Sequence, residues 1–237
     1  GKVVRGIVIL NPSNPLGITF SKQQLIPILE WAQAKQLFVI IDEIYALSYF
    51  DENSTFESSF SYEVPDPART FRAWGMSKDF GMAGIRVSAV HTCNVEVLAG
   101  LKVLGCFHCV PPILSTITSK LLTDYDWLDN VYFPENTTKL REGYNTVVEC
   151  LNRLGISYVR PKAGFFVFAN FWKQCKAVGG ELVLFERFIA EKVYFVPGIR
   201  LYCPVEGWFR IIFCVHQPQL KIALQRIEEV VKSIKID

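Results

Sequence analysis

The amino-acid sequence predicts an α/β domain with a mostly parallel sheet, followed by a smaller α+β domain. The first half of this prediction depends on apolar runs of strand length, with an amphipathic helix between the first two. The second half depends on a change of pattern after residue 133, where a long helix leads into short strands that alternate with helices. A chain of 237 residues is long enough for two cores. We therefore place a large domain at residues 1–133 and a linking helix with a small domain at 134–237.

The first elements form a βαβ unit. Val3–Leu10 is a β-rich apolar run that ends at the turn-rich segment Asn11–Gly17. Ser21 and Gln24 have the spacing of a helix-capping box, and apolar side chains then recur at helical spacing. Leu37–Ile41 is a second apolar strand. A strand, a helix and a strand in close succession predict that the two strands pair in parallel.

The same patterns predict the remaining elements. Strands are expected at Thr70–Gly75, Ile85–His91, Phe165–Asn170, Val193–Val196 and Trp208–Val215. Helices are expected between about Val95 and Leu122 with a break near Pro111, at Glu135–Leu154 with an end at Gly155, at Glu181–Lys192 and at Gln217–Ile234.

Composition and charge exclude several classes of function. A net charge of +2 without a basic run gives no case for nucleic-acid binding, and no apolar stretch approaches the length of a membrane-spanning helix. Hydrophobic residues make up 50% of the chain, which fits buried parallel strands or a surface that further protein covers. The chain starts at Gly1 without a methionine or a signal peptide, so we expect its true amino terminus to lie elsewhere.

The cysteines favour a reducing compartment. They number seven at irregular spacing, which argues against a disulfide framework and predicts a cytoplasmic location. Cys106 and Cys109 have the spacing of a redox or zinc motif, but a second pair of ligands at suitable spacing is absent. We therefore expect buried thiols and no metal site.

Polar residues follow three of the predicted strands. Asn14 comes after the first strand, Asp42 ends the second and Lys78 follows the third. Ligands of an open parallel sheet bind beyond the carboxyl ends of its strands, so these side chains would meet at one edge. Each residue alone has a simpler explanation, as a turn residue, a helix cap and a solvated lysine respectively. Their joint placement favours a ligand site.

These groups suit the chemistry of pyridoxal 5′-phosphate (PLP). A lysine amine forms a Schiff base with the cofactor aldehyde, and an aspartate keeps the pyridine nitrogen protonated, so that the ring accepts carbanion charge. Arg86 lies eight residues after Lys78, and its planar fork suits a phosphate. Arg210 lies among the large apolar side chains of Trp208–Phe213. Its charge needs a partner there, either a protein carboxylate or the carboxylate of a substrate.

Four motifs in order carry a resemblance to a known family. They are Asn-Pro-x-Asn-Pro-x-Gly at Asn11–Gly17, Asp-Glu-x-Tyr at Asp42–Tyr45, Ser-Lys-Asp-Phe-Gly-x-x-Gly-x-Arg at Ser77–Arg86 and Gly-Trp-Phe-Arg at Gly207–Arg210. Over its whole length the chain resembles the fold-type I PLP enzymes of the class I/II aminotransferase family. With Asp-Trp-x-x-x-Val-Tyr-x-Pro-Glu-Asn at Asp126–Asn136, it resembles in particular the animal 1-aminocyclopropane-1-carboxylate (ACC) synthase-like branch. The resemblance implies the PLP-dependent transferase fold, with a partial PLP-binding large domain.

The resemblance also implies roles for individual residues. Asn14 and Tyr45 would hydrogen-bond the phenolic oxygen of the cofactor, and Asp42 would hold its pyridine nitrogen. Lys78 would form the internal aldimine and move the α-proton as general acid and base. Arg86 would bind the phosphate. The implied catalytic residues are Lys78, Asp42 and Tyr45.

An amino acid is the implied substrate, and Arg210 with Asn14 would bind its carboxylate. Two positions depart from the family pattern. The family usually has a phosphate-binding serine three residues before the lysine and a glycine two residues after Arg86, whereas this chain has Gly75 and Ser88. Members of the family are nearly twice this length. The resemblance therefore implies a homodimer and an amino-terminal half of the same fold that this sequence lacks.

The sequence thus predicts a PLP-dependent enzyme that acts on the α-carbon of an amino acid through Lys78. Aminotransferase and ACC synthase-like lyase both remain open, because both reactions begin with the loss of the α-proton. The alternative is a catalytically inactive relative that keeps the fold as a binding or scaffold protein. Gly75 and the missing half favour the alternative, whereas Asp42, Tyr45 and Arg86 together with Lys78 oppose it.

Overall fold

The protein is described from a computed structural model, which describes residues 1–52 and 56–235. The chain divides into two compact units, each described here by itself. The first unit comprises Gly1–Ser13 and Thr19–Glu135, and the second comprises Asn14–Ile18 and Asn136–Asp237. The sequence analysis assigned residues 14–18 to the large domain. The division into domains at 133/134 stays a prediction.

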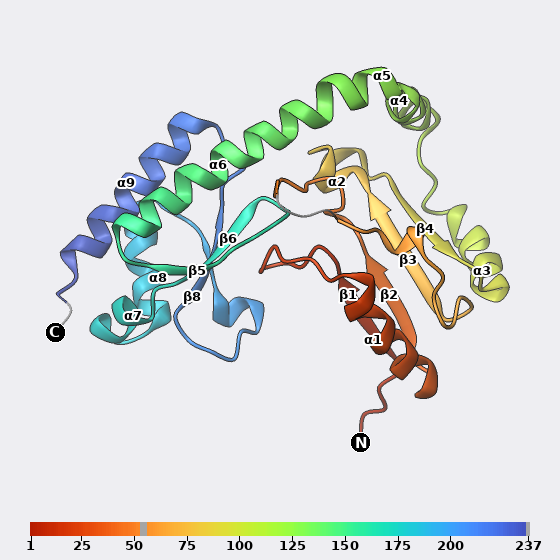
Figure 1. Ribbon diagram of the computed structural model, residues 1–237, viewed down its shortest axis with the longest axis horizontal. Coiled ribbons are helices and arrows are strands. Elements are labelled where there is room, and N and C mark those ends of the chain that lie inside the picture. Colours follow the sequence, from red (N-terminus) through yellow and green to blue (C-terminus); the bar gives the residue numbers. More distant parts are fainter. Residues whose placement is uncertain (53–55, 236–237) are drawn as a thin grey trace. The chain divides into compact units, whose positions relative to one another are not determined.

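The first unit contains a four-stranded sheet in the order β1-β2-β3-β4 (Figure 1). β1 pairs in parallel with β2, and β2 in parallel with β3, as predicted, whereas β4 is antiparallel to β3. The elements are β1 (Gly6–Leu10), α1 (Lys22–Ala34), β2 (Phe38–Asp42), η1 (Ser59–Ser61), β3 (Thr70–Gly75), α2 (Met76–Asp79), η2 (Ala83–Ile85), β4 (Ser88–Thr92), α3 (Val95–Gly105), α4 (Pro112–Thr123), α5 (Tyr125–Trp127), the π-helix η3 (Leu128–Tyr132) and the start of α6 (Phe133–Arg153).

Helix α1 covers one face of this sheet. The predicted capping box is present at its start, where the backbone N–H of Ser21 donates to Gln24 Oε1 at 2.9 Å. Leu25 and Leu29 of the helix belong to one buried cluster with Val39 and Ile41 of β2. Burial of such aliphatic side chains contributes about 1.5–3 kcal/mol each, so this contact anchors β2.

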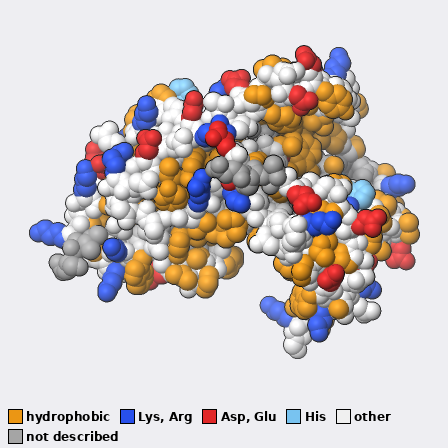
Figure 2. All heavy atoms as spheres, viewed as in Figure 1, with side chains coloured by type: hydrophobic (Ala, Val, Ile, Leu, Met, Phe, Trp, Pro, Cys, Tyr) orange, Lys and Arg blue, Asp and Glu red, His pale blue; other side chains and the backbone are white. Residues whose placement is uncertain are grey.

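The alternate side chains of the same strands are exposed. Val8, Phe38, Ile40 and Val90 point away from the α1 cluster, and 67% of the surface of Val8 is accessible. Figure 2 shows hydrophobic side chains at the surface of both units. The apolar composition of the chain therefore reflects an exposed sheet face as well as buried strands.

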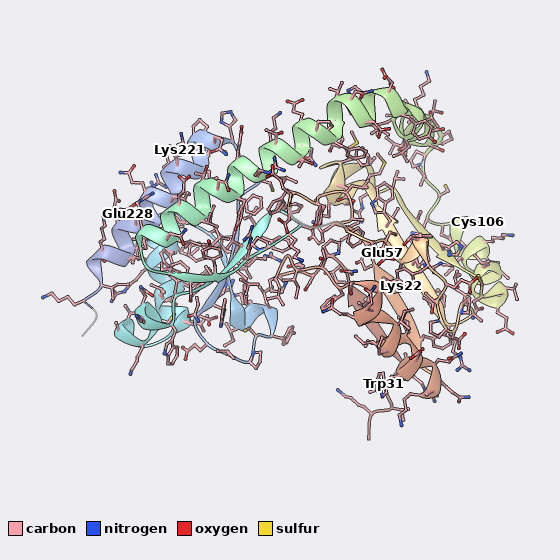
Figure 3. All side chains as sticks on the ribbon, viewed as in Figure 1. Lys22, Trp31, Glu57, Cys106, Lys221 and Glu228 are labelled. Atoms are coloured by element: carbon pink, nitrogen blue, oxygen red, sulfur yellow. The ribbon has the colours of Figure 1, made fainter. Side chains whose placement is uncertain are left out.

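The second unit contains a four-stranded antiparallel sheet in the order β5-β6-β8-β7 (Figure 1). Its elements are β5 (Ser157–Val159), β6 (Phe166–Asn170), α7 (Trp172–Val178), α8 (Glu181–Ala190), β7 (Val196–Pro197), η4 (Gly198–Leu201), β8 (Trp208–Ile212), α9 (Gln217–Ser233) and most of α6. Helices α6 and α9 lie side by side: Arg153 near the end of α6 pairs with Glu228 of α9 at 3.1 Å (Figure 3).

The structure corrects four expected strands. β4 begins at Ser88 and not at Ile85, and β8 ends at Ile212 and not at Val215. β1 begins at Gly6 and not at Val3, because Gly6 is the first residue that faces β2 and Val3 is 70% exposed. The strand expected at Val193–Val196 is only the two-residue β7, because the N–H of Val193 donates to the carbonyl of Phe188 and so closes the end of α8. Within the described residues, no helix is long and apolar enough to cross a membrane.

Candidate active site

Asp42 ends the central strand of the parallel part of the first sheet. It faces Leu10 of β1 and Ala73 of β3 in the strand register. Its Oδ1 accepts the backbone N–H of Ile44 at 3.1 Å. Burial raises the pKa of Asp42. The hydrogen bond from the Ile44 N–H opposes this rise, and the charge of Glu43 adds to it. The carboxylate is therefore partly desolvated, at the edge where ligands of such sheets bind.

Tyr45 lies in the turn that follows Asp42, and only 5% of it is exposed. The turn is held by the neighbouring Glu43, a residue to which the sequence analysis gave no role. The buried carboxylate of Glu43 accepts the Ser58 hydroxyl at 2.5 Å and the Ser59 N–H at 2.6 Å. Charge-assisted hydrogen bonds between Glu43 and the Ser58–Ser59 segment thus hold the turn that carries Asp42 and Tyr45.

Lys78 lies on α2, the four-residue helix that follows β3 without a break. The side chains of Met76 and Asp79 are buried, whereas Lys78 is exposed. Asp42 and Lys78 both leave the carboxyl ends of neighbouring parallel strands, as the sequence analysis expected. The first unit therefore brings a carboxylate and an amine to the same sheet edge.

Asp79 is a second buried carboxylate that the sequence analysis did not select. Its side chain accepts the Ser48 hydroxyl at 2.7 Å, the Trp74 indole N–H at 2.8 Å and the Leu47 N–H at 3.0 Å. Burial raises the pKa of Asp79 to about 6, and these hydrogen bonds oppose that rise. The only signal in the sequence is its place directly after Lys78.

Arg86 follows η2 and precedes β4. Its backbone is left-handed, with φ 55°, and its Nη1 donates to the carbonyl of Ala83 at 3.0 Å. The side chain is exposed. Its guanidinium keeps further N–H groups for an anion, because Arg carries five donors.

Asn14 and Arg210 meet in the second unit. Arg210 lies on β8, between β6 and β7 of the sheet, and its Nη1 donates to Asn14 Oδ1 at 2.8 Å. Its guanidinium carbon lies 5.6 Å from the centre of the Phe166 ring. The Nε of Arg210 is buried without a hydrogen-bond partner among the described residues. In the part of the chain that the structure describes, the hydrogen-bond partner of the Arg210 guanidinium is therefore the amide of Asn14 and not a carboxylate.

Gly75 and Ser88 are directly opposite each other across β3 and β4. A Cβ atom at Gly75 would lie 3.0 Å from the Cβ of Ser88 and 3.3 Å from the Cδ1 of Ile44. The two departures from the family pattern are therefore one cross-strand pair. The side chain of this pair belongs to Ser88 on β4, whereas the family has its serine at the position of Gly75 on β3. The backbone of Gly75 is extended, with φ −165°, so space and not conformation keeps this position small.

Gly75→Ser is expected to lower the free energy of unfolding by about 1–3 kcal/mol, because it overpacks this pair. Ser88→Gly in the same chain removes the nearest obstacle. The double variant should recover part of that loss, with a coupling of about 0.5–3 kcal/mol between the two positions. Urea unfolding of the four proteins measures the coupling. Strictly additive losses would show that the two side chains do not compete for space.

The cysteines differ from the expectation of buried thiols. Cys106, labelled in Figure 3, and Cys109 are exposed, since they lie beyond the end of α3. Cys150 and Cys175 are buried. Burial raises the pKa of Cys175 to about 12, and the charges of Glu181 and Glu206 add to that rise. Among the described residues, no group of three or more His, Cys, Asp or Glu side chains could hold a metal ion.

Comparison with known proteins identifies the family of the chain. The family model described as aminotransferase class I and II matches residues 1–227. The chain is 37% identical over 238 residues to "1-aminocyclopropane-1-carboxylate synthase-like protein 1" of Takifugu rubripes, covering 99% of this chain and 38% of that relative. It is 39% identical over 238 residues to "probable inactive 1-aminocyclopropane-1-carboxylate synthase-like protein 2" of Homo sapiens, covering 99% of this chain and 42% of that relative.

The fold has a solved counterpart in the aromatic aminotransferase from Pyrococcus horikoshii. The TM-score is 0.84 at 26% identity, and the match covers 97% of this chain and 60% of that one. The predicted fold is therefore confirmed, and so is the resemblance. The chain spans about two-fifths of the length of the two curated relatives. It belongs to the class I and II aminotransferases, a family of PLP-dependent enzymes that includes the ACC synthase-like proteins.

Proposed function

We propose that this chain is the carboxyl-terminal part of a PLP-dependent enzyme that acts on the α-carbon of an amino acid. The observation that carries the proposal is the placement of Asp42 and Lys78 at the ends of two neighbouring parallel strands. When bound, PLP supplies an electron sink for the negative charge that develops on the α-carbon. Lys78 holds the cofactor covalently and moves the α-proton. Asp42, Tyr45 and Lys78 are the proposed catalytic residues.

The residues of the first unit fit this cofactor. Burial raises the pKa of Asp42, and a protonated ring nitrogen beside it would stabilise the ionised carboxylate. Tyr45 is buried in the adjoining turn, which suits a fixed hydrogen bond to a ring substituent. Arg86 is exposed and suits the phosphate group. These three residues, with Lys78 and Asn14, are the proposed cofactor-binding set.

The second unit supplies the proposed site for the substrate carboxylate. Buried donors in proteins nearly always have a partner, so the buried Nε of Arg210 indicates an acceptor that a ligand brings. Asn14 orients the guanidinium through its 2.8 Å contact with Nη1. A carboxylate accepts two parallel hydrogen bonds from such a fork. Aminotransferase and ACC synthase-like lyase are both compatible with this arrangement.

Further protein belongs to the proposal as well. The exposed sheet face at Val8, Phe38 and Ile40 supports cover by an amino-terminal half of the same fold. A homodimer is proposed on the family alone. The unpaired thiols of Cys93, Cys106 and Cys109 support a reducing, cytoplasmic location.

A catalytically inactive relative that acts as a binding or scaffold protein is the second candidate. Two observations favour it: one similar human protein is named "probable inactive", and Gly75 brings no hydroxyl to the turn before Lys78. The placement of Asp42 and Lys78 after neighbouring parallel strands opposes it.

Reductive trapping distinguishes the two candidates. The complete protein is incubated with PLP, reduced with borohydride and mapped by peptide mass. We expect the label on Lys78 and none on Lys120, an exposed lysine of α4 that serves as internal control. If the complete protein is folded and Lys78 carries no label, the result favours the inactive binding or scaffold protein. Turnover of amino acids with a 2-oxo acid, compared with turnover of S-adenosylmethionine, then separates aminotransferase from lyase.

A further inference from the structure

The helix that carries Lys78 is too short to hold its own shape. α2 has four residues, about one turn, and a single turn fixes several backbone angles for one hydrogen bond. Its position must therefore come from contacts with the rest of the first unit. Two buried side chains supply these contacts on one side, Met76 and Phe80, which lie in one apolar cluster with Leu128. Apolar packing is non-directional. It keeps one side of α2 buried but does little to fix the orientation of the helix about its axis.

Asp79 supplies the directional contacts. Its Oδ1 accepts the hydroxyl of Ser48, and its Oδ2 accepts both the Leu47 N–H and the indole N–H of Trp74. Ser48 and Leu47 belong to the segment just after Tyr45, and Trp74 lies on β3. One carboxylate thus joins the Lys78 turn to the Tyr45 segment and to the preceding strand.

The main chain of Asp79 adds a fourth contact. Its carbonyl accepts the hydroxyl of Tyr132 at 2.8 Å, and Tyr132 stacks on Phe80 with ring centres 5.0 Å apart. Asp79 is only 1% exposed, although it adjoins the exposed Lys78. A carboxylate that is buried to this extent is costly to keep, so its retention beside the reactive amine calls for a role.

We infer that Asp79 is a positioning residue, whose ionised carboxylate sets the orientation of the Lys78 turn relative to the Tyr45 segment. The inference rests on the proposed function, since it concerns the same site. Asp79 does not touch the cofactor or the substrate in this account. It acts through Lys78, which it follows at the end of α2.

The ionisation state of Asp79 decides how many of these contacts form. The N–H groups of Leu47 and Trp74 can only donate, whereas the Ser48 hydroxyl can also accept. A proton on Asp79 would therefore reverse the Ser48 contact or weaken the two N–H contacts. The pKa of about 6 puts this change within the range of pH 5 to pH 9 that an absorbance titration covers. Above it the carboxylate accepts all three bonds, and below it the Lys78 turn loosens.

Other ionisable groups around Asp79 do not account for such a step near pH 6. Tyr132, from η3, has its pKa raised by burial and then by the charge of Asp79, which takes it further from this range. Lys78 is the adjoining charge on α2 itself. Ser48, Leu47 and Trp74 bring no group that titrates near neutrality.

The test uses the complete protein loaded with PLP and follows the visible absorption band of the Lys78-bound cofactor from pH 5 to pH 9. The wild type should show a spectral step near pH 6, and Asp79→Asn should lose it. Ser48→Ala and Trp74→Phe each remove a donor and keep the carboxylate, so they should move the step to higher pH by about 0.5–1 unit. Asp129→Asn, on an exposed residue of η3, makes the same charge change and should leave the step in place.

The outcomes separate the inference from the proposed function. A wild type without any Lys78-bound band overturns the proposed function, and the inference with it. A band whose step persists in Asp79→Asn, or does not move in Ser48→Ala and Trp74→Phe, overturns the inference alone. The two donor variants keep the test decisive if Asp79→Asn does not fold. A merely structural role would not shift the step in a fixed direction.

Discussion

Lys78→Arg should lower turnover by the complete protein about 10³-fold or more, while its thermal unfolding stays within a few degrees of the wild type. Arginine keeps the positive charge and the length of the side chain, but its guanidinium stays protonated throughout the working pH range. It can therefore neither hold the cofactor covalently nor move the α-proton. Lys78 is exposed on α2, so the substitution removes no core contact.

The measurement is the half-reaction of cofactor and amino acid, followed by absorbance under single-turnover conditions. Lys120→Arg makes the same change on the exposed face of α4 and should leave the rate unchanged. Retention of a tenth or more of the wild-type rate in Lys78→Arg would remove Lys78 from the chemistry. Equal loss in both variants would point to a general effect on the protein.

Phe209→Ala should lower the free energy of unfolding by about 3–5 kcal/mol. Phe209 lies on β8 with no exposed surface, and its ring centre is 5.2 Å from that of Phe195 and 5.5 Å from that of Phe171. The rings meet edge to face, which adds to the loss when one is removed. Because Arg210 adjoins Phe209 on the strand, the substitution should also weaken the proposed carboxylate site.

Guanidinium chloride unfolding measures this loss. Phe107→Ala is the matched control, because Phe107 is 80% exposed and its removal should change the free energy of unfolding by less than about 0.5 kcal/mol. A loss below about 1 kcal/mol in Phe209→Ala would show that the aromatic cluster of the second unit repacks around the gap.

Local pattern was enough for the longer elements of the fold. Thr70–Gly75 was predicted with the bounds that β3 has, and the capping box at Ser21 marked the start of α1. The short β5 and the helix α7 were not expected, because three to seven residues give too little periodicity to recognise. The antiparallel direction of β4 was also beyond the sequence, since local patterning carries no strand direction.

In the candidate site, too, local patterns revealed some residues and only the tertiary structure revealed others. Asp42 and Lys78 were recognisable because polar residues at the ends of apolar strands stand out locally. The Asn14–Arg210 hydrogen bond joins residues 196 positions apart, and only tertiary structure shows it. Asp79 takes its donors from 31 and 32 positions away as well as from nearby Trp74, so its burial was not visible either.

The second unit is built from two separate stretches of the chain, because it includes the segment Asn14–Ile18. The carbonyl of Gly17 accepts the N–H groups of Lys162 and Ala163 at 2.8 and 3.1 Å, and a side chain at position 17 would collide with Pro161. The chain thus crosses between the units three times, at residues 13/14, 18/19 and 135/136. No single cut yields the second unit intact, so recombination at one point could not have transplanted it as a self-sufficient module.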